Sequence, residues 1–214
     1  LRGMVALSLA AALLAGCGGG TTQVDPFIPE RLITFGDESG LLEASGRRHG
    51  INGLDSEGVF DCTLLPTWTQ SLAAFYGFVF EACPTTATEF KALQRAKSGE
   101  GAEQLAAQVQ AQVDAGGFTA TDLATVMVGT KDIIDIYERV GVDLTQAEAE
   151  DLLEARGKLV AAQVNKMIDL GAKVIVATVP RIDQTPYGIA REAASPGQAQ
   201  VMKALSEEFN AALR

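Results

Sequence analysis

The stretch Leu32-Ile33-Thr34-Phe35-Gly36-Asp37-Glu38-Ser39 decides the fold of this chain. Its first four residues form a short apolar run that breaks at glycine into acids and a hydroxyl. This pattern is typical of a buried strand that is followed by polar side chains at one edge of a parallel sheet. Ligands of open α/β sheets bind outside the carboxyl ends of the strands. The sequence therefore places Asp37, Glu38 and Ser39 on the floor of a candidate site; the alternative, that Gly36-Asp37 is only a turn, stays open here.

Further strands and helices are expected to alternate after this stretch. Two more apolar runs read as buried strands, over 124–129 and 173–179, and residues 40–61 predict a small hairpin or excursion after the first strand. Strands that alternate with helices imply right-handed crossovers and a parallel sheet. The helices are expected to open at Pro66-Thr67, to run from Leu105 towards Gly116, to run from Thr145 to Leu170 behind a Thr145/Glu148 capping box, and to cover 196–213.

Composition limits the functional classes. The 214 residues are 47% hydrophobic, which suffices for one α/β domain, and the net charge of −10 without a basic patch argues against nucleic acid as a partner. His49 is the single histidine, which excludes a multi-histidine metal site, and it reads as a solvated loop residue. The three cysteines have no C-x-x-C spacing, and nucleotide-binding glycine motifs are absent. We expect neither a metal nor a cofactor.

The N-terminus reads as an export signal. A basic start, a short apolar run and small residues precede Cys17, and Leu14-Ala15-Gly16-Cys17 resembles the bacterial lipobox. That resemblance implies cleavage before Cys17 and a lipid anchor on its thiol, so that the protein lies on a membrane of the bacterial envelope and faces the periplasm or the cell surface. An ordinary signal with a chance cysteine is the alternative. The expected organisation is a signal over 1–17, a flexible tether over 18–30 and one α/β domain over 31–214.

Two further cysteines, Cys62 and Cys83, bracket the helix that opens at Pro66-Thr67. Outside the reducing cytoplasm two such cysteines are expected to pair as a disulfide. Two independent buried thiols are the alternative.

Three stretches together resemble the GDSL-type hydrolases, also called the SGNH superfamily, in order and spacing. The similar blocks are 35–39 (Phe-Gly-Asp-Glu-Ser), 96–100 (Ala-Lys-Ser-Gly-Glu) and 128–132 (Val-Gly-Thr-Lys-Asp), and residues 176–187 resemble the family's stretch after its fourth strand. The resemblance implies a flavodoxin-like three-layer α/β/α sandwich. It also implies hydrolysis of an acyl ester without a metal, by a serine nucleophile, a histidine base and oxyanion donors.

The chain departs from this family pattern at the residues that matter for catalysis. Glu38 occupies the nucleophile position, and Ser39 is a displaced nucleophile candidate one place later. Lys131 replaces the oxyanion asparagine, whereas Gly99 can still offer its backbone N–H as an oxyanion donor and Asp37 would orient the loop. The family's Asp-x-x-His block is missing, so the domain is expected to lack its last strand or loop. A fragment of a longer chain and a divergent member that has lost hydrolysis are both open explanations.

Three functions follow from these residues. The first is an envelope-anchored esterase of a small acyl ester, a lipid or an acetylated glycan, and the second is a non-catalytic surface lipoprotein that binds a glycan or lipid in the old cleft. The third, a carboxylate hydrolase using Asp37 and Glu38, has little support because adjacent residues rarely face each other across a substrate. We expect little or no ester turnover by these 214 residues. A Ser39–Lys131 pair could rescue it only if the pKa of Lys131 were lowered. The sequence makes no prediction about oligomeric state.

Overall fold

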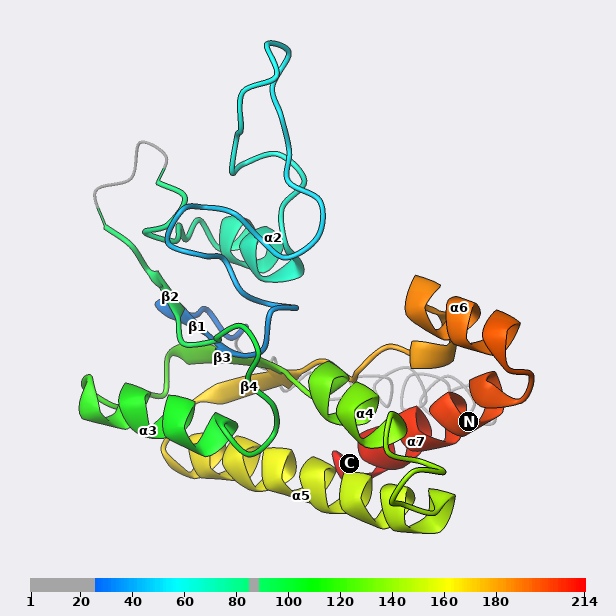
Figure 1. The fold of residues 1–214 in the computed structure, drawn as a ribbon. Coiled ribbons are helices and arrows are strands. Elements are labelled where there is room, and N and C mark those ends of the chain that lie inside the picture. Colours follow the sequence, from blue (N-terminus) through cyan, green and yellow to red (C-terminus); the bar gives the residue numbers. More distant parts are fainter. Residues whose placement is uncertain (1–25, 85–88) are drawn as a thin grey trace, which may run out of the picture.

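The computed structural model describes residues 26–84 and 89–214 (Figure 1). The expected signal, the lipobox with Cys17 and all but residues 26–30 of the expected tether lie outside the described residues. No helix within the described ranges has the length and apolar character that crossing a bilayer requires.

Four parallel strands form the sheet of the molecule. In the described chain they are β1 (Arg31–Gly36), β2 (Ala92–Gln94), β3 (Asp122–Met127) and β4 (Lys173–Val176), in the order β2-β1-β3-β4. Ile33 of β1 is in register with Leu93 of β2 and Ala124 of β3. This order is that of a flavodoxin-like sheet over its first four positions.

Helices cover both faces of the sheet, which gives the three layers. Figure 1 shows α2 (Trp68–Phe75) on one side and α3 (Leu105–Asp114) and α5 (Gln146–Asp169) on the other. Alternate residues of β1 serve the two sides: Leu32 packs in a cluster with Ala73 of α2, whereas Ile33 packs in the larger core with Leu105 of α3. The expected flavodoxin-like α/β/α sandwich is therefore confirmed.

The remaining helices follow the carboxyl ends of β3 and β4. These are α4 (Thr130–Tyr137), the 3-10 turn η2 (Ile182–Gln184), α6 (Pro186–Ala194) and α7 (Gln198–Ala212), and α7 packs along α5. Both expected caps are present: Thr67 and Gln70 form a capping box on α2, and Thr145 and Glu148 form one on α5.

Several boundaries differ from the expectation. Strand β3 begins two residues earlier than predicted and β4 ends three residues earlier, while β2 and α4 were not predicted as elements. The excursion after β1 contains no strand; a single antiparallel bridge joins Leu54 to Phe60. His49 is exposed there, as expected.

The predicted disulfide is confirmed. Cys62 is bonded to Cys83, with 5.7 Å between their Cα atoms. The bond ties the excursion to the segment that follows α2. Arg48, itself buried, reinforces the same place because its guanidinium donates to the carbonyl oxygens of Leu64 at 2.8 Å and Cys62 at 2.9 Å.

Candidate functional site

The carboxyl ends of β1 and β3 meet at the candidate site. Gly36 lies directly beside Met127, where a Cβ on Gly36 would stand 1.8 Å from the Met127 carbonyl oxygen, so only glycine fits. Gln108 of α3 locks this point: its amide accepts from the Gly36 N–H and donates to the Gly36 carbonyl, both at 2.8 Å. This role could not be predicted from the sequence, because a glutamine on a helix ordinarily faces solvent.

Asp37 is buried at the end of β1 with half of its carboxylate unpartnered. Oδ1 accepts the Ser39 N–H at 2.9 Å, whereas Oδ2 has no hydrogen-bond partner within the described part of the chain. Burial raises the pKa of Asp37 above its ordinary value, although the hydrogen bond from the Ser39 N–H opposes the shift. The expected role of Asp37 in orienting the loop fits its bond to the Ser39 backbone.

Glu38 is the residue that faces the expected oxyanion donor. Its Oε2 accepts the backbone N–H of Gly99 at 2.9 Å, across 61 positions of sequence. Ser39 is bonded on its other side, since its backbone N–H donates to the Asp37 carboxylate at 2.9 Å. The structure thus brings Glu38 and Gly99 together. The displaced nucleophile candidate Ser39 has no contact with Gly99 among the hydrogen bonds of the described residues.

Lys131 lies in the first turn of α4 and is held by its own helix. Its ammonium pairs with Asp135, one turn further on. This bond raises the pKa of Lys131, and the charges of Asp132 and Glu38 act in the same direction. This direction is opposite to the lowered pKa that a neutral Lys131 base would need.

Asp132 has a role at the site that the sequence analysis missed. Its Oδ2 accepts the Ala102 N–H at 2.9 Å, and a Cβ on Gly101 would stand 2.7 Å from the same oxygen. Burial raises the pKa of Asp132. The carboxylate thus clamps the loop that carries Gly99 onto α4. Two glycines close together in one loop, Gly99 and Gly101, were the one sequence feature that pointed to a close approach.

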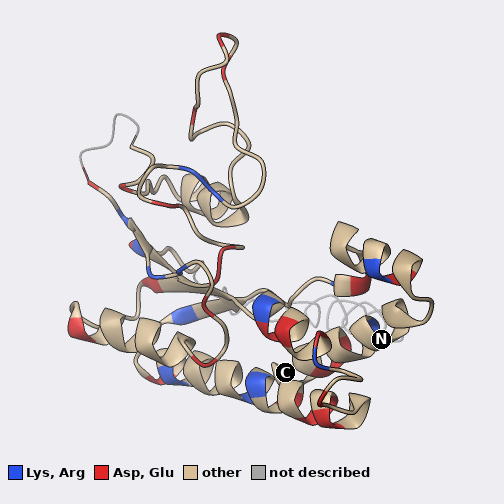
Figure 2. Cartoon of the chain, viewed as in Figure 1, with Lys and Arg blue, Asp and Glu red and all other residues tan. Residues whose placement is uncertain are grey.

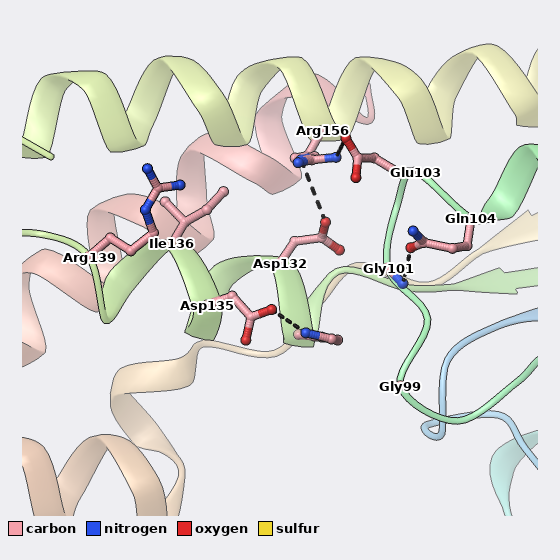
Figure 3. Close-up of a pocket in the computed structure, with 10 residues that line it drawn as sticks. Gly99, Gly101, Glu103, Gln104, Asp132, Asp135, Ile136, Arg139 and Arg156 are labelled. Carbon is pink, nitrogen blue, oxygen red and sulfur yellow. Dashed lines mark hydrogen bonds and ion pairs between the residues drawn. The ribbon is translucent and has the colours of Figure 1, made fainter. Parts of the chain in front are cut away.

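A pocket of about 300 Å³ opens beside Gly99, between this loop, α4 and α5 (Figure 3). Arg156 projects from α5 into its wall, where it contacts Glu103 and approaches Asp132 at 3.8 Å. Basic and acidic positions are interspersed along α4 and α5 (Figure 2). The lining is polar and charged: Gly99, Gly101, Glu103, Gln104, Lys131, Asp132, Asp135, Ile136, Arg139 and Arg156. Within residues 26–84 and 89–214, no three His, Cys, Asp or Glu side chains gather as metal ligands do.

No family model and no curated protein matches this chain. Among solved structures, TesA is similar at 16% identity with a TM-score of 0.44, over 86% of this chain and 72% of TesA. Axe2, an acetylxylan esterase from Geobacillus stearothermophilus, is similar at 17% identity with a TM-score of 0.43, over 86% of this chain and 76% of Axe2. The strand order described above, not these likenesses, establishes the fold.

Proposed function

We propose that this chain is a bacterial envelope lipoprotein with the cleft of a GDSL-type acyl ester hydrolase, and that its 214 residues turn over esters slowly or not at all. The observation that carries the proposal is the bond from the Gly99 N–H to the Glu38 carboxylate. The donor expected to bind an oxyanion is occupied by an oxygen anion of the chain itself. A carboxylate carries its negative charge on planar oxygens, as the acid product of ester hydrolysis does.

Catalysis by this arrangement is expected to be weak for three reasons. Glu38 occupies the nucleophile position and competes with substrate for the Gly99 donor. Ser39 donates its backbone N–H to Asp37, and among the hydrogen bonds of the described residues no imidazole accepts from its hydroxyl. Lys131 stays protonated beside Asp135, so that it can donate to an oxyanion but cannot take a proton. Loss of a single oxyanion donor already costs about 10²–10³ in rate.

A binding experiment tests the cleft directly. In Glu38→Ala the Gly99 donor is free, so acetate, the product of acetyl ester hydrolysis, is expected to shift the Gly99 amide resonance in a saturable manner. Glu38→Gln is the matched control, because its amide oxygen still accepts from Gly99, and acetate should leave its resonance in place. A Glu38→Ala spectrum that acetate does not change contradicts the proposed cleft.

A kinetic experiment tests the expected inactivity. Short-chain nitrophenyl esters are offered to the protein and to Ser39→Ala, Glu38→Ala and Lys131→Ala. Background rates in all four support the proposal. Robust turnover that Ser39→Ala or Glu38→Ala abolishes overturns the inactive assignment and identifies the nucleophile.

The proposed location rests on the lipobox-like Leu14-Ala15-Gly16-Cys17. A diacylated Cys17 would hold the protein at a membrane of the envelope, with a Gly-rich tether before the folded part. Expressed with its leader in a bacterium, the protein is expected to fractionate with membranes, and Cys17→Ser should release it or leave it unprocessed. An unmodified mature N-terminus at another residue, seen by mass spectrometry, would refute the anchor.

A second candidate function is binding without catalysis, of a glycan or a lipid, in the same cleft. The observation that favours it is the polar pocket beside Gly99, which is already shaped and has charged groups that the hydrolytic proposal does not use.

A further inference from the structure

Helix α5 carries a second row of residues on the side away from the core. Its buried residues, among them Leu153 and Val160, pack in the main core. Six other positions, spaced alternately four and three residues apart, are exposed: Glu148, Leu152, Ala155, Leu159, Ala162 and Lys166. Side chains at this spacing lie in one row along a helix, as in the contact face of a coiled coil. We call these six residues the outer seam of α5, which runs along the lower border of the molecule in Figure 1.

The middle of the outer seam is apolar and uncovered. Leu152 is 37% exposed and Leu159 is 43% exposed. A single exposed leucine is ordinary on a protein surface. Here two leucines lie one heptad apart, and exposed alanines at 155 and 162 continue the row. Polar residues border it at 151, 158 and 165, as they do at the rim of a protein interface.

The outer seam is complementary in shape to a second copy of itself that runs in the opposite direction. A two-fold axis near Gly157 brings Leu159 against Ala155 of the second copy. The same axis brings Leu152 against Ala162 of the second copy. Each layer then pairs a large side chain with a small one, so the two helices can approach closely without a gap. In a parallel arrangement leucine would face leucine and alanine would face alanine, and the layers would alternate between wide and narrow.

Opposite charges meet at both ends of the antiparallel pair. Glu148, in the first turn of α5, faces Lys166, in the last turn, of the second copy. Glu148 binds Thr145 through Oε2, which leaves Oε1 without a partner among the described residues. Lys166 donates to Gln110 at 3.3 Å and belongs to no ion pair in the described part of the chain. Because a parallel pair would oppose like charges at both ends, the charges favour the antiparallel direction.

The cations beside the centre of the outer seam already have acidic partners. Lys158 is paired with Glu154, and Arg156 is paired with Glu103. The two-fold axis would bring each of these cations near its own copy. Their acidic partners reduce the repulsion that would otherwise oppose the contact.

We propose that two copies of this protein form a dimer in which the outer seams of their α5 helices pack antiparallel. The row from Glu148 to Lys166 is about 27 Å long at the rise of an α-helix. One helix pair of this length lies at the small end of specific interfaces, so we expect a dissociation constant in the micromolar range and not an obligate dimer. The proposal is independent of the proposed function, since none of the six seam residues lines the pocket beside Gly99.

Analytical ultracentrifugation of the full chain over a range of concentrations tests the dimer. The parent is expected to pass from monomer to dimer as the concentration rises. Leu159→Glu would bury two unpaired carboxylates in each dimer, so it should raise the dissociation constant by about a hundredfold or more. In the monomer this side chain is already half-exposed, so the fold should tolerate the change.

Ile168→Glu is the matched control. Ile168 lies on the same helix and is 50% exposed, but it is outside the outer seam, so this variant should dimerise as the parent does. A parent that stays monomeric at millimolar concentration overturns the proposal. Association that survives Leu159→Glu, or that both variants weaken equally, also overturns it, because another surface would then be responsible.

Charge reversal tests the antiparallel register. Lys166→Glu places two carboxylates at each end of the dimer and should raise the dissociation constant by about tenfold. The double variant Glu148→Lys/Lys166→Glu restores opposite charges and should dimerise more tightly than either single variant. Thr145 still caps α5 in it through the backbone N–H at position 148, and equal helix content by circular dichroism checks this. A double variant no tighter than Lys166→Glu shows that these two side chains do not meet, and it overturns the proposed register.

Discussion

Two buried aspartates lie at opposite ends of the same pair of strands, and their surroundings differ. Asp122 begins β3, and Asp37 follows β1; each is 1% exposed. Asp122 receives two hydrogen bonds from Arg31, at 2.5 and 2.8 Å, and one from the Thr119 N–H at 2.7 Å. Asp37 receives one from Ser39, and its other oxygen has no partner among the described residues.

The pKa values of the two groups shift in opposite directions. Burial alone would raise the pKa of Asp122, but the bonds from Arg31 and Thr119 outweigh it and the pKa lies below the ordinary value. At Asp37 burial prevails and the pKa is raised. At the amino end of the sheet, the buried charge of Asp122 therefore stabilises the fold. The carboxyl end keeps a charge that costs stability, which is typical of a site retained for binding or chemistry.

The largest expected effect comes from filling Gly36 at the carboxyl end. In Gly36→Ala the new Cβ would meet the Met127 carbonyl oxygen at 1.8 Å, in a backbone with φ of +124°, so β1 and β3 must separate. We expect a loss of about 4 kcal/mol or more in the free energy of unfolding, measured by urea denaturation.

Gly117→Ala at the amino end is the matched control. Its φ of +75° disfavours a side chain, but no atom lies within 4 Å of the new Cβ. A loss of about 1–2 kcal/mol is expected there. Equal losses in the two variants would contradict the tight junction at Gly36.

The next effect comes from breaking the ion pair at the amino end. Arg31→Ala leaves the Asp122 carboxylate buried with only the Thr119 backbone bond, and we expect the free energy of unfolding to fall by about 3 kcal/mol at pH 7. Lys158→Ala removes an exposed pair on α5 and should cost less than about 1 kcal/mol.

The contribution of this ion pair to stability depends on pH. The folded pKa of Asp122 lies below the ordinary 3.8, so its contribution is fully present above 3.8 and is lost as the pH falls through the folded value. Arg31→Ala should flatten that acid-side loss. An unchanged acid limb would mean that Asp122 is stabilised by something other than Arg31.

The smallest expected effect is an increase in the free energy of unfolding, at Asp37. Asp37→Asn keeps an acceptor for the Ser39 N–H and removes the buried charge, so we expect the free energy of unfolding to rise by about 1 kcal/mol at pH 7.

The pH range of this stability difference follows from the raised pKa of Asp37. Because the folded pKa of Asp37 is raised, the parent protein loses stability as the pH rises from 3.8 through that value, and the variant does not. The difference should therefore disappear below about pH 3.8. A variant that is less stable than the parent at pH 7 would show that the Asp37 carboxylate has a stabilising partner.

Much of the fold could be predicted because local signals agreed with the tertiary structure. The apolar run of β1 indicates a buried strand, and the Thr145/Glu148 capping box indicates the start of α5, each without reference to the rest of the chain. Strand β2 has three residues, Ala92–Gln94, which are too few to give a local pattern, and it is defined by its pairing with β1. Helix α4 begins at Thr130 with Gly129 as its N-cap residue, which has no side chain to cap it, so no start signal precedes it.

The site could be predicted only to the level of segments. Spacing brings block 35–39 near Gly99, but it cannot tell which of two adjacent side chains turns towards that glycine. The structure selects Glu38. Asp132 and Arg156 were missed because their partners lie 30 and 53 positions away, at Ala102 and Glu103, and charged residues on helices ordinarily face solvent.

The parallel order of the sheet also sets the time at which the chain can fold. Strand β1 is made first, yet both its neighbours come later: Leu32 aligns with Ala92, and Arg31 bonds to Asp122 across 91 positions. At roughly 5–20 residues per second of synthesis, the central strand waits about 5–20 s for β3. Contacts this distant in sequence also fold slowly. During that interval the apolar run Leu32 to Phe35 is unprotected, so a chaperone that keeps it from aggregating would suit the order in which this sheet is built.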